Sequence, residues 1–258
     1  MKEDKYKDDA LTLDEFLRGK SKRELYSIIS KLLGYDQVPP DIDEFISDPA
    51  YLGGVLEGGA SVYEYWKSAL RIIYPNPFVS PYLEVVATGA IGIGKTTLAK
   101  IGSSYDIAKM TMLSDPHRSF GIVKTEKIQY AIINATMNLA KSVIYDELIS
   151  WWNASPYFSS LMKKNKSNDS LFPKRIHLTV GSRPQHFIGK HIFGAIMDEM
   201  NFQDRVANQA YDNYTNVLRR MKSRFGVSKY FPGHLWLLSS KRRDTDPLQV
   251  HIEKSRDD

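Results

Sequence analysis

The chain has 258 residues, of which 42% are hydrophobic and 25% charged, so it is long enough for one large α/β domain with an appendage. It contains no cysteine, which excludes disulfide bonds and thiolate metal sites, and no apolar run approaches the roughly 20 residues that a membrane span needs. The net charge of +5 permits a polyanionic partner such as nucleic acid without requiring one.

Short helices are predicted in the first part of the chain. The first nine residues are charged and lack the apolar core of a secretory signal, so we expect a cytoplasmic location. Capping-box patterns at 12–15, 21–24 and 61–64 predict three helix starts. We therefore expect a helical N-terminal subdomain and linker over 1–75, followed by a larger core over 76–258.

Residues 89–96 match the phosphate-binding loop pattern G-x-x-x-x-G-K-[ST] in full. The preceding 82–88 is typical of a buried strand, and 97–110 is typical of a helix with an apolar face. Backbone N–H groups of such a loop point at phosphate oxygens, so the chain is predicted to bind a nucleoside triphosphate. The predicted nucleotide-binding residues are Gly89, Ala90, Ile91, Gly92, Ile93, Gly94, Lys95, Thr96 and Thr97.

Two side chains of this loop have predicted chemical roles. Lys95 supplies a positive charge for the β- and γ-phosphates, and the Thr96 hydroxyl ligates Mg²⁺. Gly89 and Gly94 allow the backbone to turn tightly. The alternative is an ordinary glycine-rich turn, which the flanking strand and helix disfavour.

Beyond the loop helix, strands and helices are predicted to alternate, which indicates a mostly parallel sheet with helices on both faces. The apolar run before Asp198 is typical of a central parallel strand. The predicted strands are 119–125, 175–181, 191–197 and 234–239, the predicted helices are 126–150 and 206–225, the latter ended by Gly226, and 163–170 is a polar loop.

An acidic pair follows the apolar strand 191–197. Asp198 is predicted to hold Mg²⁺ together with Thr96, and Glu199 to take a proton from the attacking water. The alternative is that the two carboxylates merely end a buried strand. The upstream phosphate loop favours the catalytic interpretation.

Two patterns are set aside. Residues 165–168 resemble the guanine-reading motif N-K-x-D, but the last position is Asn168, so specificity for GTP loses support. The six histidines show no H-x-x-x-H or H-E-x-x-H spacing, so no catalytic zinc site is predicted.

Together these features resemble the ATPase domain of the large terminase subunit of tailed bacteriophages, the motor that packages DNA into procapsids. The resemblance covers most of 80–245 and rests on four segments in order. These are 89–97, similar to the family's phosphate loop; 120–129, similar to its second strand and the following helix; 180–189 close ahead of 196–199, the most specific of the four; and 239–241, similar to its coupling motif.

The resemblance implies a RecA-like P-loop NTPase of the additional-strand, catalytic-glutamate type. Such a domain hydrolyses ATP with Mg²⁺ and moves double-stranded DNA without reading its sequence, while Ser239, Ser240 and Lys241 link nucleotide state to movement. It also implies a pentameric homo-oligomeric ring on the portal protein, a small terminase subunit as partner, and action in the cytoplasm of an infected bacterial host. From the residues alone, Ser239 and Ser240 could equally be a simple strand terminus. As an isolated domain, the chain is expected to be a monomer.

Two departures from the family's pattern modify these expectations. Many terminases carry an arginine before the glycine that matches Gly189, whereas this chain has Ile188, and its phosphate loop contains no arginine. A basic residue that acts in trans on a neighbour's ATP is therefore expected, with Arg183 or Lys190 as candidates. No second acidic cluster with the character of a two-metal site follows the coupling segment, so nuclease activity is not expected in this chain.

The basic stretches of the sequence and the function of the phosphate loop each have more than one interpretation. The basic stretches are candidates for sequence-independent DNA contacts, or else solvated surface. A nucleotide or small-molecule kinase would share the phosphate loop without needing the acidic pair, and an ATP-gated assembly module would bind ATP without hydrolysing it. The two basic stretches are Lys163, Lys164, Lys166, Lys174 and Arg175, and Arg219, Arg220, Lys222 and Arg224.

Overall fold

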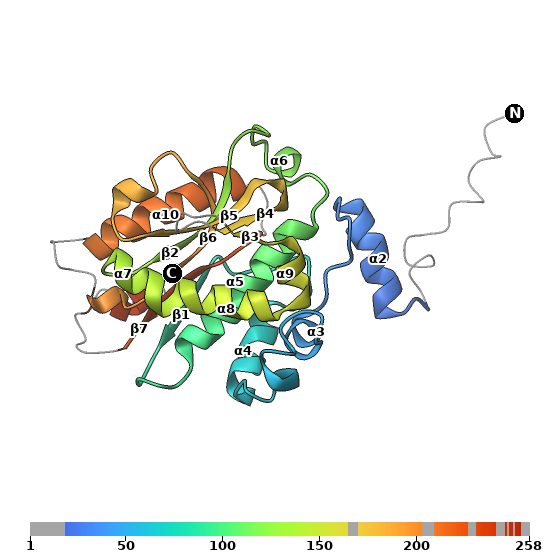
Figure 1. Ribbon diagram of the computed structural model, residues 1–258, viewed down its shortest axis with the longest axis horizontal. Coiled ribbons are helices and arrows are strands. Elements are labelled where there is room, and N and C mark those ends of the chain that lie inside the picture. Colours follow the sequence, from blue (N-terminus) through green and yellow to red (C-terminus); the bar gives the residue numbers. More distant parts are fainter. Residues whose placement is uncertain are drawn as a thin grey trace, which may run out of the picture.

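The computed structural model describes residues 19–164, 170–202, 209–226, 231–240, 246, 248–249 and 251–253. Within this part of the chain lies a seven-stranded sheet with the order β1-β7-β6-β2-β5-β4-β3 (Figure 1). The first five strands in that order are parallel, and β4 and β3 continue the sheet with antiparallel pairing. The strands are β1 (Glu84–Thr88), β2 (Ile128–Ile133), β3 (Lys163–Lys164), β4 (Ser170–Phe172), β5 (Ile176–Gly181), β6 (His191–Met197) and β7 (Leu235–Ser239).

The position of β7 identifies the type of P-loop fold. It lies between β1, which enters the phosphate loop, and β6, which ends at the acidic pair. An extra strand between these two is the arrangement that the additional-strand, catalytic-glutamate type requires. The predicted fold class, a mostly parallel α/β P-loop NTPase of this type, is therefore confirmed.

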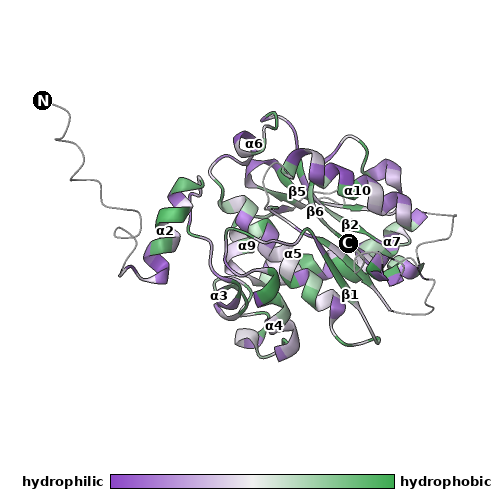
Figure 2. Ribbon diagram, turned by 180° about the vertical axis from the view of Figure 1, so that it is seen from behind, coloured by the Kyte–Doolittle hydropathy of each residue, from purple (hydrophilic) through white to green (hydrophobic). Residues whose placement is uncertain are grey.

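Helices cover both faces of the sheet, as Figure 1 shows for α5 and α8 on one side and α10 on the other. The faces follow from the alternation of strand side chains. In β2, Ile128, Tyr130 and Ile132 pack with α5 and α8, whereas Ala131 and Ile133 pack with α10. Apolar strands thus lie between helices that carry much of the polar surface (Figure 2).

The described helices vary widely in length. The main ones are α2 (Lys22–Leu32), α3 (Ile42–Ser47), α4 (Glu64–Ile73), α5 (Lys95–Met112), α6 (Pro116–Ser119), α7 (Met137–Leu139), the π-helical turn η2 (Ala140–Tyr145), α8 (Asp146–Ala154), α9 (Pro156–Leu161) and α10 (Gln209–Phe225), and the 3₁₀ turns are η1 (Glu57–Gly59), η3 (Pro173–Arg175), η4 (Pro184–His186) and η5 (Met200–Phe202). Among the described residues, no helix combines the length and the hydropathy needed to cross a membrane.

Helices α3 and α4 pack directly onto the nucleotide-binding core. Phe45 of α3, Leu52, and Trp66 and Leu70 of α4 belong to the same buried cluster as the inner face of α5. Helix α2 lies further out, at one end of the molecule (Figure 1). These helices share a hydrophobic core with the sheet. The predicted division of the chain after residue 75 stays a prediction.

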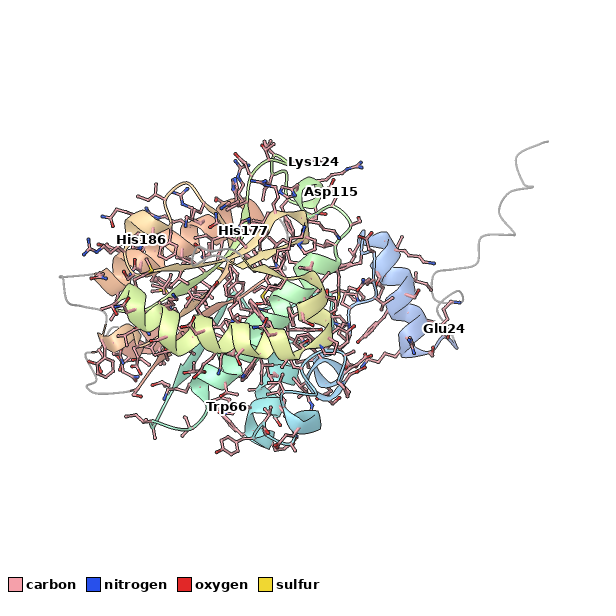
Figure 3. All side chains as sticks on the ribbon, viewed as in Figure 1. Glu24, Trp66, Asp115, Lys124, His177 and His186 are labelled. Atoms are coloured by element: carbon pink, nitrogen blue, oxygen red, sulfur yellow. The ribbon has the colours of Figure 1, made fainter. Side chains whose placement is uncertain are left out.

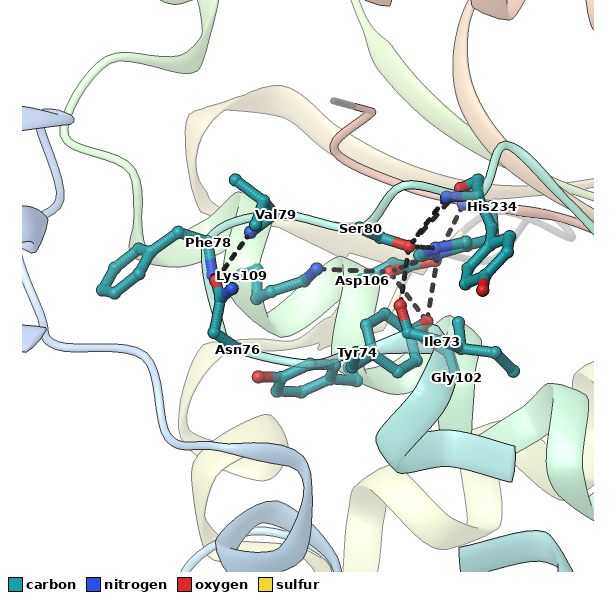
Figure 4. A network of polar contacts seen from close by, with 12 residues as sticks. Ile73, Tyr74, Asn76, Phe78, Val79, Ser80, Gly102, Asp106, Lys109 and His234 are labelled. Carbon is teal, nitrogen blue, oxygen red and sulfur yellow. Dashed lines mark hydrogen bonds and ion pairs between the residues drawn. The ribbon is translucent and has the colours of Figure 1, made fainter. Parts of the chain in front are cut away.

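A buried polar network holds the carboxyl-terminal half of α5 against the start of β7 (Figure 4). Both carboxylate oxygens of Asp106 lie within 3.1 Å of Nδ1 of His234, and Nε2 of His234 lies 2.8 Å from the Ser80 hydroxyl. The Tyr74 hydroxyl donates to Asp106 at 3.0 Å, and the Lys109 ammonium lies 3.6 Å from the same carboxylate. Hydrogen bonds therefore join three segments: residues 74–80 ahead of β1, helix α5, and the residue before β7.

One pair of predicted elements is wrong. Residues 119–125 form the end of α6 and a turn rather than a strand, and 128–133, predicted as the start of a helix, is the central strand β2. All six residues of β2 are buried because helices cover both faces, so the strand shows no alternation in its sequence. A short run of this kind cannot be told from a buried helix by periodicity alone. The resemblance likened 120–129 to a strand followed by a helix. In the structure the strand begins only at Ile128, and the next helix begins at Met137.

The predicted helix starts have mixed outcomes. The capping box at Ser21 and Glu24 is confirmed, with Oε2 of Glu24 accepting the Ser21 N–H at 2.8 Å. The one at Ser61 is wrong, because its hydroxyl donates to Glu57 and α4 begins after Tyr63 instead. The pattern at 12–15, the start of the helix predicted from 206, the motif at 165–168 and Lys241 lie outside the described residues.

Candidate functional site

The phosphate loop has the backbone shape that its sequence predicts. Gly89, Gly92 and Gly94 have φ angles of 137°, 83° and 86°, a region that residues with a Cβ rarely adopt. Gly94 is the N-cap of α5, so the unpaired N–H groups of the first helical turn face the loop. A helix N-terminus of this kind attracts anions, and it is the expected place for phosphate oxygens.

The Lys95 ammonium is held at the mouth of the loop. Its Nζ donates to the carbonyls of Gly89 at 3.2 Å and Ala90 at 2.7 Å, and to the Ser240 hydroxyl at 3.4 Å. The predicted phosphate-binding lysine and the predicted coupling serine, 145 residues apart, therefore meet in space.

Strand β6 delivers the acidic pair to the same place. The N–H of Asp198 donates to the Ile133 carbonyl at 2.9 Å, which continues the pairing of β6 with β2 by one residue. Burial, and secondarily the negative charge of Glu199, raise the pKa of Asp198 to about 6, while Lys95 acts in the opposite direction. Burial and the charge of Glu199 therefore disfavour the ionised form of Asp198, and a cation beside the carboxylate stabilises that form.

Glu199 combines two features that are costly in a folded protein. Its φ angle is 51°, a left-handed conformation that is rare for residues other than glycine, asparagine and aspartate. Its Oε2 atom is buried, and no hydrogen-bond partner for it is found among the described residues. Backbone strain and unsatisfied buried polar atoms are common at functional sites, so both features agree with the prediction that Glu199 has a catalytic role, which stays a prediction.

These groups line one cleft of about 300 Å³. Its donor set suits Mg²⁺, because the Thr96 hydroxyl and the Asp198 carboxylate are oxygen ligands, and this ion keeps several waters and takes phosphate oxygens as well. No group of three or more His, Asp or Glu side chains able to hold a metal by itself occurs in the described residues. The cleft is lined by Ile91, Gly92, Gly94, Lys95, Thr96, Thr97, Asp198, Glu199 and Ser240.

A second recess of about 600 Å³ adjoins the loop on the side of α4. Gly94 and Thr97 contribute to it from the loop, and Tyr63 and Trp66 from the start of α4. Nε1 of Trp66 donates to the Ile93 carbonyl at 2.6 Å, and Figure 3 shows Trp66 on the flank formed by α4. Sequence reasoning assigned Trp66 only to a helix, because nothing in the pattern places it against a loop 27 residues away.

Two asparagines near the acidic pair were also missed. Asn134 directly follows β2, and its Nδ2 lies 3.5 Å from the Asp198 carboxylate. Asn201 lies two residues after Glu199 and bonds to the end of β7. The misplacement of β2 hid the first of these. A correct assignment would have placed Asn134 at the carboxyl edge of the sheet, beside Asp198.

The two candidates for a trans-acting basic residue lie in different places. Arg183 follows β5 at the carboxyl edge and lines a recess of about 810 Å³ that His186 and the segment 135–138 also line. Lys190 precedes β6, at the opposite edge, and its Nζ donates to the Thr179 hydroxyl at 3.2 Å. Strand β6 separates Lys190 from Asp198 and spans roughly 20 Å, so Lys190 does not lie at the cleft of its own chain.

Comparisons with known proteins concern the fold of this chain. The fold is similar to the large terminase of bacteriophage HK97, with 15% sequence identity and a TM-score of 0.50 over 76% of this chain and 37% of that one. An arginine-to-alanine mutant of the ATPase domain of the Thermus phage P74-26 large terminase gives 12% identity and a TM-score of 0.37, over 62% and 60% of the two chains. No curated protein matches the sequence.

At the level of the fold, the likeness to HK97 confirms the resemblance that the sequence motifs suggested. The chain spans 37% of the length of that terminase, and the likeness extends to the fold alone. One family model covers residues 54–256, which include α4, the phosphate loop, the acidic pair and the end of β7. The chain therefore belongs to the family described as "Uncharacterized protein MJ0330, N-terminal P-loop domain".

Proposed function

We propose that this chain hydrolyses ATP and uses the energy to move double-stranded DNA into a viral procapsid, as the ATPase domain of a packaging motor. The observation that carries the ATPase part is the position of Glu199, which lines the same cleft as Lys95 and Thr96 and whose buried Oε2 atom has no hydrogen-bond partner among the described residues. A carboxylate oxygen of this kind is available to accept a proton. ATP hydrolysis needs such a group beside the γ-phosphate.

Each group has a role in the proposed reaction. The loop N–H groups and Lys95 bind the β- and γ-phosphates, and Glu199 orients a water molecule and takes its proton as the water attacks the γ-phosphorus. The bond between the γ-phosphorus and the bridging oxygen breaks, so that ADP and phosphate leave. Mg²⁺, held by Thr96 and Asp198, would neutralise charge on the phosphate oxygens. Proton removal by a buried carboxylate contributes about 10²–10⁴-fold in typical enzymes.

The recess beside α4 supports a nucleoside triphosphate as ligand rather than a free polyphosphate. It continues from Gly94 and Thr97 away from the acidic pair, which is the direction in which the base and sugar extend from the phosphates. Tyr63 is 65% exposed there, so its ring has a face available for stacking on a base. We therefore assign the nucleoside to the recess lined by Tyr63 and Trp66.

The motor part of the proposal rests on the fold and on the resemblance in sequence. In this proposal the protein acts in the cytoplasm of an infected bacterial host, as a ring on the portal protein with a small terminase subunit as partner. The DNA is gripped through its phosphates, so binding is independent of sequence and weakens with salt. Arg183, at the carboxyl edge of the sheet, is the better placed candidate for acting on a neighbour's ATP.

One observation favours a second candidate function, a phosphotransferase acting on a small molecule. The recess lined by Arg183 and His186 lies outside the carboxyl ends of β2 and β5, where open α/β sheets bind their ligands. An acceptor bound there would approach the cleft through Asn134, which contacts Asp198. A kinase would transfer the γ-phosphoryl group to that acceptor and release little free phosphate.

The test is phosphate release from ATP at increasing protein concentration, with and without double-stranded DNA of two unrelated sequences. We expect turnover per chain to rise with concentration, because a basic residue acts in trans, and to rise further with either DNA. Turnover that is independent of concentration would argue for a self-contained site. No phosphate release under any of these conditions would contradict the proposal, and transfer to a small-molecule acceptor would support the kinase.

A further inference from the structure

The turn that carries Glu199 is followed at once by a short 3₁₀ segment. Glu199 has left-handed backbone dihedrals, and its carbonyl accepts the N–H of Phe202 at 2.8 Å. The turn η5 (Met200–Phe202) therefore begins directly after the residue that we propose as the general base, and it is hydrogen-bonded to that residue. Asn201 is the middle residue of this turn, two positions from Glu199.

Asn201 is buried and joins η5 to two other parts of the chain. Its backbone N–H donates to the Ser239 hydroxyl at 3.2 Å, and its Nδ2 donates to the Ser240 carbonyl at 3.0 Å. Its Oδ1 accepts the N–H of Leu248, also at 3.0 Å. The residue is 7% exposed, so these hydrogen bonds are shielded from water and leaving them unmade would be costly.

The far side of this connection reaches the nucleotide cleft again. Ser240 lines the cleft, and its hydroxyl accepts a hydrogen bond from Lys95 at 3.4 Å. A continuous path therefore leads from Glu199 through Asn201 to Ser240 and back to Lys95. When phosphate oxygens engage Lys95 and a water molecule engages Glu199, both ends of the path acquire a new contact.

From this geometry we infer that Asn201 is a positioning residue that couples the turn of Glu199 to the strand end at Ser239 and Ser240. The inference rests on the proposed ATPase function and extends it, because neither the sequence motifs nor the fold assigns a role to Asn201. It predicts that nucleotide binding reorganises the end of β7 only while the Asn201 amide holds Ser240. Without that bond, the cleft still binds ATP but no longer aligns Glu199 for turnover.

Two variants separate the amide from the rest of the residue. Asn201→Asp keeps the size of the side chain and the acceptor for Leu248, but it removes the Nδ2 donor and places a carboxylate oxygen against the Ser240 carbonyl. Asn201→Ala removes both side-chain bonds and leaves the backbone bond to Ser239. Thermal unfolding identifies which variants are folded. If Asn201→Asp does not fold, the kinetic comparison is made with Asn201→Ala.

The matched control is Asn213→Asp. Asn213 is a fully buried asparagine on α10, and its Nδ2 donates to the Ser182 carbonyl at 3.3 Å. The control therefore makes the same chemical change to the same type of bond, at a residue that is not among the described residues lining the cleft. We expect it to cost stability while leaving the kinetic constants of ATP hydrolysis close to those of the wild type.

Two measurements are made on each folded variant: kcat and KM for ATP, and hydrogen exchange of β7 and Ser240 with and without a non-hydrolysable ATP analogue. For both Asn201 variants we expect kcat to fall by at least about tenfold while KM changes by less than about twofold. The analogue should alter exchange at β7 and Ser240 in the wild type and in Asn213→Asp, and leave it unaltered in the Asn201 variants.

The outcomes distinguish this inference from the function on which it rests. A wild-type protein that hydrolyses ATP, together with an Asn201→Asp variant of unchanged kcat and unchanged exchange response, would overturn the inference and leave the ATPase function standing. A parallel loss in both measurements for Asn213→Asp would overturn it as well, because the effect would then follow from lost stability. A wild-type protein that binds no ATP would overturn both.

Discussion

The indole N–H of Trp66 donates a hydrogen bond of 2.6 Å to the backbone carbonyl of Ile93, inside the phosphate loop. A Cβ atom at Gly94 would lie 3.1 Å from the same indole nitrogen, so the ring also packs against the last turn of the loop. The shape of the loop thus depends on α4, a helix outside the P-loop motif. This contact has a direct consequence for nucleotide affinity.

Replacing Trp66 by Phe should weaken ATP binding. The substitution keeps an aromatic ring but removes the donor to Ile93, and a hydrogen bond of this type contributes about 0.5–1.5 kcal/mol. If that amount is lost from the bound state, KM for ATP rises by up to about tenfold while kcat changes little. Steady-state kinetics check this.

Trp151→Phe is the control for that substitution, since Trp151 lies on α8 and contacts Lys100 rather than the loop. Equal KM values for the wild type and Trp66→Phe would show that the contact does not shape the site.

The packing of α5 against β7 predicts an unusual effect of an alanine substitution. Glycine to alanine inside a helix is normally stabilising, but a Cβ at Gly102 would lie 1.9 Å from the ring of Trp236. We expect Gly102→Ala to lower the free energy of unfolding by about 1–3 kcal/mol, as overpacked cores do. Gly54→Ala, which meets no atom within 4 Å, should be nearly neutral by chemical denaturation. A Gly102→Ala protein as stable as the wild type would contradict the close contact.

The buried network around Asp106 predicts a large loss of stability. Asp106→Ala would leave Lys109 and His234 buried without their carboxylate partner, and removal of one partner of a buried ion pair costs about 3–5 kcal/mol. Tyr74→Phe removes one hydrogen bond from the same carboxylate and should cost about 1 kcal/mol. Denaturant titration of both variants measures the difference. Equal losses would mean that the network is not organised around Asp106.

Much of the site could be predicted from the sequence because its signals are local. The phosphate loop is fixed by glycines at set spacing, and β6 coincides with the predicted strand 191–197 because an unbroken apolar run followed by two carboxylates has few other structures. The end of α10 was likewise marked by Gly226. These features depend on neighbouring residues, which a sequence displays directly.

The parts that were missed depend on contacts between distant residues. Strand β2 has lost its alternation because it is buried on both faces, and Asn134 was hidden with it. Trp66 contacts the loop through one hydrogen bond across 27 residues, and Asn201 makes hydrogen bonds to residues 38 or more positions away. No periodicity in the sequence reports such bonds. The antiparallel pair β3 and β4 is too short to leave a pattern.

The most direct test of the account is the Glu199→Gln variant, studied by ATP binding and by turnover on the same preparation. The amide has the size of the carboxylate but cannot accept the proton of the attacking water, so we predict that ATP still binds with nearly unchanged affinity while kcat falls by about 10²–10⁴-fold. An amide at this position also relieves the repulsion with Asp198, so weaker binding is not expected. Turnover at the wild-type rate in Glu199→Gln would contradict the assignment of Glu199 as the base, and with it the central claim.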